Sequence, residues 1–312
     1  MKTAMRKQSL KKNTLTKTMK RYGGYYAMLV LPLIYFVIFK YVPMIGNVLA
    51  FRRYSPTAPL LGSEWAGLEY FRQFLTSSDF WVKFKNTLCI SILSLVFSFP
   101  MPIIFALLLN ELRNVKFKKF VQTASYLPHF ISMVVMAGFV FQLTSTNGGL
   151  INDILAFFGK EKINFMAEPK YFRPIYIISG IWQELGWNAI IYIAAMTGID
   201  QELYEAGAID GTNKFKEIIY ITIPCVAPTI IISLIMSVGG ILGVGYEKIL
   251  LLMNDMNKET ADVISTYVYR MGLINNNYSY STAVGLFDAV IGLILVWTAN
   301  FIANKVADTA LW

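Results

Sequence analysis

The chain contains few of the residues from which catalytic sites are usually built. Its 312 residues include one histidine and two cysteines, and only 15% of them are charged. With a single histidine, His129, no His-based metal site or catalytic triad is expected. The patterns GxxxxGK[ST], HExxH, GxSxG and CxxC do not occur in the sequence. The chain is therefore not expected to hydrolyse ATP through a phosphate-binding loop of its own, and no cofactor or metal site is expected in it.

The abundant feature is apolar sequence. Hydrophobic residues make up 55% of the chain, which is typical of a membrane protein. The two cysteines, Cys89 and Cys225, lie in or beside apolar runs and are expected to act as small buried hydrophobes without a disulfide. We predict an all-α membrane protein with six transmembrane helices, at about residues 25–51, 86–110, 124–142, 174–198, 223–244 and 281–303.

The charge distribution predicts how the chain is oriented in the membrane. Residues 1–22 carry eight Lys or Arg and no Asp or Glu, so we interpret them as a basic cytoplasmic tail that precedes a membrane domain at 23–312. With that orientation the inner segments hold fifteen basic and seven acidic residues, against twelve and ten outside. The tail leads directly into an apolar span, which disfavours a role in binding nucleic acid.

A polar stretch at 199–222 separates the fourth and fifth predicted spans. Asp200 is a candidate N-cap, Gly211 can end a first helix, and Thr212 can cap a second helix that runs to Tyr220. We therefore predict a cytoplasmic helix–turn–helix. On its first helix, Glu205, Ala206 and Ile209 can form a small apolar knob with a carboxylate at its rim, whereas Tyr204, Ala208 and Phe215 can face the other way.

The spacing within this stretch resembles the "EAA" signature of importer-type ABC transporter permeases, Glu-Ala-Ala, three residues, Gly, nine residues, Ile-x-Leu-Pro. The matching positions are Glu205, Ala206, Gly207, Gly211, Ile221, Ile223 and Pro224. Gly207 replaces the second alanine and Ile223 replaces leucine, and both changes conserve size or apolar character. The resemblance implies contact with a separate ATPase through Tyr204, Glu205, Ala206, Gly207, Ile209, Asp210 and Gly211.

Three further stretches, 41–46, 181–187 and 262–270, resemble carbohydrate-uptake permeases of the maltose-type class, in particular the polysaccharide and oligosaccharide group. The resemblance implies the type I ABC importer permease fold in a bacterial cytoplasmic membrane. It also implies a heterodimer with a second homologous permease, two copies of an ATP-binding subunit that hold ATP and Mg, and an extracytoplasmic solute-binding protein. The particular cargo is not identified by the sequence.

Polar residues inside the predicted spans are candidates for the substrate pathway, because polar groups at membrane depth are costly unless they pair or line a cavity. They are Trp182, Gln183, Glu184, Trp187, Asn188 and Asp288. The indoles can stack on a sugar ring and the amides can bond to its hydroxyls, but the same groups can equally join one helix to another. His129 is interpreted as an interfacial residue, and Lys40 as one that reaches the interface.

Two other classes of protein are compatible with six spans. An integral-membrane enzyme of lipid-linked sugar transfer needs clustered carboxylates or histidine, but Asp200, Glu202 and Glu205 are spaced as in a capped helix. An ion-coupled carrier needs several buried ionisable residues, and only Glu184 and Asp288 qualify. Co-purification with a P-loop ATPase separates both alternatives from an importer.

Overall fold

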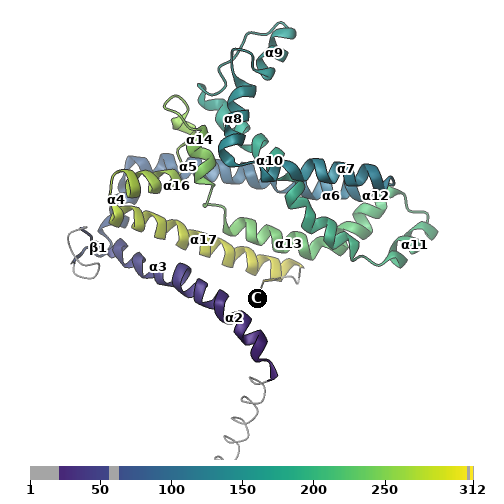
Figure 1. Ribbon diagram of the computed structural model, residues 1–312, viewed down its shortest axis with the longest axis horizontal. Helices are drawn as coiled ribbons and strands as arrows, with labels where there is room; N and C mark the ends of the chain where they lie inside the picture. Colours follow the sequence, from purple (N-terminus) through teal and green to yellow (C-terminus); the bar gives the residue numbers. More distant parts are fainter. Residues whose placement is uncertain (1–20, 56–62, 308–309, 312) are drawn as a thin grey trace, which may run out of the picture.

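The computed structural model describes residues 21–55, 63–307 and 310–311. Most of the predicted basic tail, residues 1–20, lies outside the described residues. The first predicted span is a continuous helical segment at Gly23–Phe51. It comprises α2 (Gly23–Phe36), a π turn η1 (Val37–Tyr41), α3 (Val42–Met44) and a 3₁₀ segment η2 (Ile45–Phe51). Figure 1 shows that α2 diverges from the other helices, while η2 packs against α17.

The remaining long helices form a bundle (Figure 1). One continuous helix is made of α5 (Ser78–Leu93), η3 (Ser94–Ser98) and α6 (Pro100–Asn110), and α10 (Pro169–Thr197) packs along it. Another comprises α12 (Lys214–Glu217), η5 (Ile218–Thr222) and α13 (Ile223–Gly239), and α17 (Tyr278–Ala307) lies against α13. The fifth predicted span ends earlier than expected, because the helix stops at Gly239.

Within the described residues, four helices are long and apolar enough to cross a membrane, and one bent pair would make a fifth. The helix α10 has 29 residues, or about 43 Å at 1.5 Å per residue, so it is also long enough to cross. Its polar residues, among them Gln183, Glu184 and Asn188, lower its hydropathy.

The third predicted span, 124–142, is not a single helix. The helix α7 (Val115–Tyr126) and the 3₁₀ turn η4 (Leu127–Phe130) meet α8 (Met133–Thr144) at 102°. Pro128 lacks a backbone donor, and the Ser132 side chain accepts from the amide of Val135 to cap the new helix. The side chain of Gln183 donates to the carbonyl of Ile131 (3.1 Å), which provides a partner for a backbone group at the break.

Beyond the break, α8 and the short helix α9 (Leu150–Phe157) project from the bundle, as Figure 1 shows. Asn152, which is fully buried, holds the connection by donating to the carbonyls of Thr144, Ser145 and Ile163.

The end of the bundle that carries β1 (Arg52–Arg53) holds the other short elements. A two-residue antiparallel pairing joins β1 to β2 (Glu64–Trp65), with Arg52 opposite Trp65. The helices are α4 (Glu69–Thr76), α14 (Tyr246–Leu252), α15 (Lys258–Ala261) and α16 (Ile264–Tyr269), which continues into the π turn η6 (Arg270–Ile274).

Buried charge joins these short elements to α5. The carboxylate of Asp262 is almost fully buried, and lies 2.7 Å from Arg270 and 3.3 Å from Lys83. Burial alone raises the pKa of this carboxyl, but hydrogen bonds from Arg270 and Thr266 and the charges of Arg270 and Lys83 lower it below its usual value. Asp262 is therefore ionised at neutral pH and ties α16 to the bundle.

Candidate coupling helix and membrane cavity

The predicted helix–turn–helix is present, with one change in its caps. The first helix is α11 (Gln201–Ile209), and the side chain of Asp200 accepts from the amide of Glu202 (3.1 Å), as expected. Gly211 follows with a φ of +74°, a conformation that glycine adopts without strain. The cap of the second helix is not Thr212 but Asn213, whose side chain accepts from the amide of Lys216 (2.9 Å).

Thr212 has a different role from the one predicted. Its hydroxyl donates to the carbonyl of Gly207 at 2.7 Å, and therefore closes the turn onto the first helix. Since Asn213 lies one residue later in the chain, it is the residue that precedes the helical backbone and can cap it. The second helix is also longer than predicted, because it runs without interruption into α13.

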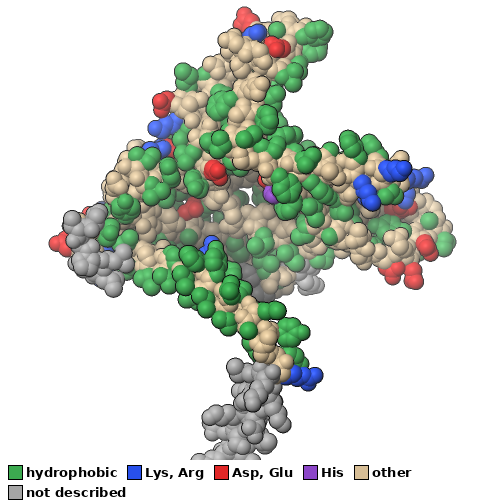
Figure 2. All heavy atoms as spheres, in the orientation of Figure 1, with side chains coloured by type: hydrophobic (Ala, Val, Ile, Leu, Met, Phe, Trp, Pro, Cys, Tyr) green, Lys and Arg blue, Asp and Glu red, His purple; other side chains and the backbone are tan. Residues whose placement is uncertain are grey.

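One face of α11 is open to solvent. Glu205, Ala206, Asp210 and Gly211 are all exposed, and Ile209 is 86% exposed. The predicted knob of apolar side chains with a carboxylate at its rim is therefore present. Figure 2 shows acidic side chains over α11, and Lys and Arg side chains over the adjoining ends of α6, α7 and α12. This end of the molecule is the most highly charged part of the face shown.

The opposite face of α11 packs on the bundle. The hydroxyl of Tyr204 lies 2.9 Å from that of Thr222, and its ring contacts the cluster that contains Met196 and Val226. Gly207 is buried, and a Cβ atom there would lie 2.9 Å from Cδ1 of Ile221. A side chain at this position of the signature would therefore be crowded by Ile221 and Thr212 and would require them to shift. Ala208 and Phe215 do not share the buried side with Tyr204, because both are exposed.

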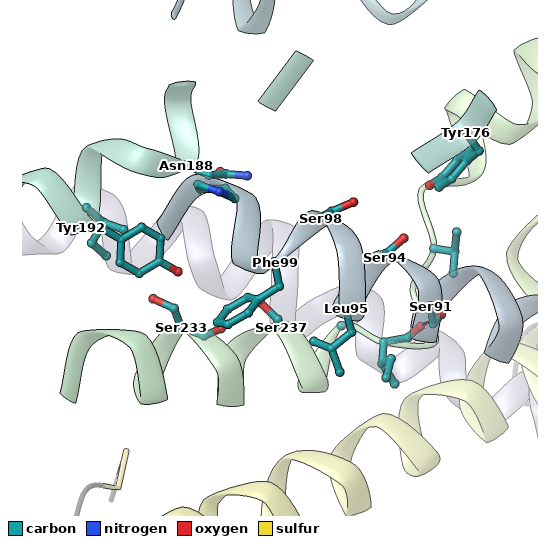
Figure 3. A pocket seen from close by; sticks show the side chains of 15 residues that line it. Ser91, Ser94, Leu95, Ser98, Phe99, Tyr176, Asn188, Tyr192, Ser233 and Ser237 are labelled. Atoms are coloured by element: carbon teal, nitrogen blue, oxygen red, sulfur yellow. Dashed lines mark hydrogen bonds between the residues drawn. The ribbon is translucent and has the colours of Figure 1, made fainter. Parts of the chain in front are cut away.

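A polar cavity of about 380 Å³ lies within the bundle between α5–η3, α10 and α13. Figure 3 shows Ser91, Ser94 and Ser98 along one helix and Ser233 with Ser237 on α13. The hydroxyl of Tyr192, on α10, points toward Ser233. The lining also includes Tyr176, Asn188, Leu95 and Phe99. Hydroxyl and amide groups beside aromatic rings can bind a neutral, hydroxylated ligand.

A second cavity, of about 420 Å³, adjoins the first and shares Ser94, Ser98, Tyr176 and Asn188 with it. It adds charged groups, namely Glu184, Glu247 and Lys248. Lys248 is only 6% exposed, and its ammonium donates to the carbonyl of Tyr176 (2.7 Å) and lies 4.4 Å from the centre of that ring. Burial lowers the pKa of Lys248 to about 7, and the charge of Glu184 opposes that shift.

The six residues predicted for the substrate pathway are dispersed. Asn188 lines both cavities, and Gln183 and Glu184 line the second. Trp182 instead lines an apolar groove between α8 and α10, and Trp187 stacks on the ring of His129 with centroids 4.2 Å apart. Asp288 lines none of the cavities described, and one of its carboxylate oxygens is buried without a hydrogen-bond partner in the described chain.

His129, which was predicted to be an interfacial residue, makes specific contacts with side chains of α10. Its Nδ1 atom lies 2.9 Å from a carboxylate oxygen of Glu184. With Trp187 stacked on the same ring, these contacts hold the turn η4 against α10 at the point where the third span breaks. Glu184 therefore faces both the break and the second cavity.

The cavity residues that sequence reasoning missed carry a weak signal. Ser91, Ser94 and Ser98 are three and four residues apart, and Ser233 and Ser237 are four apart, so each set lies on one face of its helix. Lys248 carries no such signal, because it lies in a separate short helix. Among the described residues, no group of three or more His, Cys, Asp or Glu side chains could hold a metal ion.

A polar cavity among apolar helices and an exposed helix α11 at one end of the bundle are compatible with a membrane transport subunit. The chain belongs to the family described as binding-protein-dependent transport system inner membrane component, whose model matches residues 98–308. It is 46% identical over 307 residues to the polygalacturonan/rhamnogalacturonan transport system permease protein YteP of Bacillus subtilis (strain 168). That match covers 98% of this chain and 95% of the relative. Protein LplB of the same organism is 42% identical and covers 94% of the chain and 92% of the relative.

Solved structures show the same fold at full length. A chain of the bacterial alginate ABC transporter, in complex with an alginate pentasaccharide-bound periplasmic protein, superimposes with a TM-score of 0.87 at 43% identity. The match covers 95% of this chain and 99% of that one. Another structure, of a bacterial ABC transporter involved in the import of the acidic polysaccharide alginate, has a TM-score of 0.86 at 44% identity, over 94% and 99% of the two chains. The predicted type I importer permease fold is therefore confirmed.

Proposed function

We propose that this chain is one of two permease subunits in an ATP-driven importer of oligosaccharides or polysaccharide fragments. The observation that carries the proposal is the exposed face of α11, which an ATP-binding subunit can engage, at the end of a helix bundle that contains a hydroxyl-lined cavity. The N-terminus is cytoplasmic in this proposal, so α11 faces the cytoplasm. The chain itself does not hydrolyse ATP.

The coupling step relies on α11 moving as a rigid body. Glu205 and Ile209 engage the ATP-binding subunit, while Tyr204 connects the helix to the start of the α13 segment through Thr222. The cluster that Tyr204 contacts includes Tyr192, which also lines the first cavity. A displacement of α11 is thus passed through packed side chains to the cavity wall.

The cargo assignment is supported by the relatives and by the cavity. One relative, at 46% identity, is named for polygalacturonan and rhamnogalacturonan transport, and the two solved chains, at 44% and 43% identity, belong to alginate transporters. The cavity offers serine, tyrosine and asparagine side chains, which are suitable for sugar hydroxyls. By analogy with the neighbour that is bound to a periplasmic protein, an extracytoplasmic solute-binding protein delivers the sugar. A second permease and two ATP-binding subunits complete the proposed assembly.

The test is ATP hydrolysis by the complex reconstituted in proteoliposomes with its sugar-loaded solute-binding protein. We expect Glu205→Ala to remove most of the stimulation by the loaded binding protein. Gly211→Leu should do the same, because a non-glycine residue at a φ of +74° is strained and would reorient the turn. Glu202→Ala is the control, since Glu202 is an exposed carboxylate of the same helix outside the knob. Unchanged stimulation in both test variants would contradict the coupling role.

A further inference from the structure

The second cavity contains a buried ammonium group that forms no ion pair within the described chain. Lys248 is 6% exposed, and no carboxylate of the described chain lies within the 4.0 Å that defines an ion pair. Its ammonium has three donors, of which one is used, in the hydrogen bond to the carbonyl of Tyr176. A buried charge without a counter-ion is costly, so packing alone does not account for a lysine here.

The surroundings of Lys248 favour an anionic ligand over a structural ion pair. Apart from Glu184 and Glu247, neither of which lies within ion-pair distance of the ammonium, the cavity wall that Lys248 shares with Ser94, Ser98 and Asn188 is made of neutral groups. The carbonyl of Tyr176 accepts the hydrogen bond and the face of its ring lies against the ammonium, so both contacts hold the Lys248 side chain in the cavity wall. Gly180 gives the ammonium room, because a Cβ atom there would lie 3.0 Å from Nζ. The site is therefore built around the cation.

We infer that Lys248 binds a carboxylate of the transported sugar, so that the cargo is an acidic oligosaccharide such as a uronic-acid oligomer. The neighbouring hydroxyl and amide groups bind the ring hydroxyls of the same sugar unit. Glu184 and Glu247, which line the same cavity, disfavour a second carboxylate close by and so help to set the register of a polyanionic chain. This inference rests on the proposed function and specifies its substrate class.

The experiment compares two probes of equal length that differ only in charge, trigalacturonate and its fully methyl-esterified form. Initial uptake into proteoliposomes is measured with the complete complex, below saturation, and is normalised to the amount of each probe bound by the solute-binding protein. Two variants separate charge from hydrogen bonding. Lys248→Gln keeps a hydrogen-bond donor without the charge, whereas Lys248→Met removes both donor and charge. Lys160→Met, at an exposed lysine, is the control.

We expect both Lys248 variants to lower uptake of trigalacturonate about tenfold, which corresponds to about 1.4 kcal/mol and matches one charge-assisted hydrogen bond. Uptake of the methyl ester should be unchanged, and the amount of co-purified ATP-binding subunit should equal that of the wild type. Equal loss for both probes would show that Lys248 is structural and would overturn the inference. If the wild-type complex takes up only the methyl ester, the inference about Lys248 is overturned but the proposal of sugar import stands. If the wild-type complex takes up neither probe, the result counts against the proposed function as well.

Discussion

The hydroxyl of Tyr204 lies 2.9 Å from the hydroxyl of Thr222, and this contact joins α11 to the start of the long α13 segment. Thr222 is 2% exposed, so the contact is protected from water. The two residues are 18 positions apart in the chain. A hydrogen bond between protein groups contributes about 1 kcal/mol net, and more when its loss leaves a buried group unpaired. The contact ties α11 to the helix formed by α12, η5 and α13.

Tyr204→Phe removes that hydrogen bond and keeps the ring. We expect the ATP-binding subunit to associate normally but stimulation of ATP hydrolysis by the loaded binding protein to fall several-fold, because about 1 kcal/mol of the link is lost. Stimulated hydrolysis in proteoliposomes is the measurement. Tyr220→Phe serves as the matched control, since Tyr220 is 72% exposed. Equal stimulation in wild type and Tyr204→Phe would contradict the link.

Gly207 and Ala206 are adjacent but should respond oppositely to the same enlargement. Gly207→Leu places a side chain against Ile221 and Thr212, so thermal stability should drop by about 1–3 kcal/mol through overpacking. Ala206→Leu should leave stability unchanged and weaken association with the ATP-binding subunit, because Ala206 is exposed. Thermal denaturation and co-purification distinguish the two. Identical behaviour of both variants would refute the assignment of one face to packing and the other to docking.

The contact between His129 and Glu184 should hold the break in the third span against α10. A double-mutant cycle with His129→Ala and Glu184→Ala is expected to give a coupling energy of about 1 kcal/mol in thermal stability. The control cycle pairs His129→Ala with Glu168→Ala. Glu168 occupies the N-cap position of α10 and precedes Glu184 by sixteen residues, or about 24 Å along the helix. Additive effects in the first cycle would mean that the contact does not stabilise the fold.

Lys248 should make stability depend on pH. Burial lowers its pKa to about 7 in the folded chain, against about 10.4 when unfolded. Between these values the unfolded state binds more protons, so stability rises with pH by up to about 1.4 kcal/mol per unit. Below pH 7 the destabilisation is complete, and it disappears as pH rises to 10.4.

The measurement is the difference in thermal stability between wild type and Lys248→Met at several pH values. The difference removes contributions from groups that titrate independently of Lys248. We expect Lys248→Met to be more stable than wild type at pH 7 and the gap to narrow toward pH 10. A gap that is constant over this range would show that the ammonium is not desolvated.

The coupling helix could be predicted from the sequence because its signals are local. The N-cap at Asp200, the turn at Gly211 and the spacing of the signature all lie within one stretch of chain, and the structure places them as predicted. The error in the second cap, Asn213 instead of Thr212, is a shift of one residue between two residue types that both favour N-caps. The inward side of α11 is set by its contacts with Ile221 and Thr222. The prediction was right for Tyr204 and wrong for Ala208 and Phe215, which are exposed.

The apolar runs determined the fold class and the approximate limits of the helices, because burial in lipid requires long apolar segments whose backbone bonds are satisfied internally. Only the tertiary structure decided where the third span breaks, since the contacts at the break come from α10 through Gln183, Glu184 and Trp187. It also decided the cavity. Asn188 and Tyr192, Ser94 and Ser98, and Lys248 come from separate parts of the chain. These residues come together only because the helices pack against one another, and no local sequence pattern indicates which distant residues helix packing brings into contact.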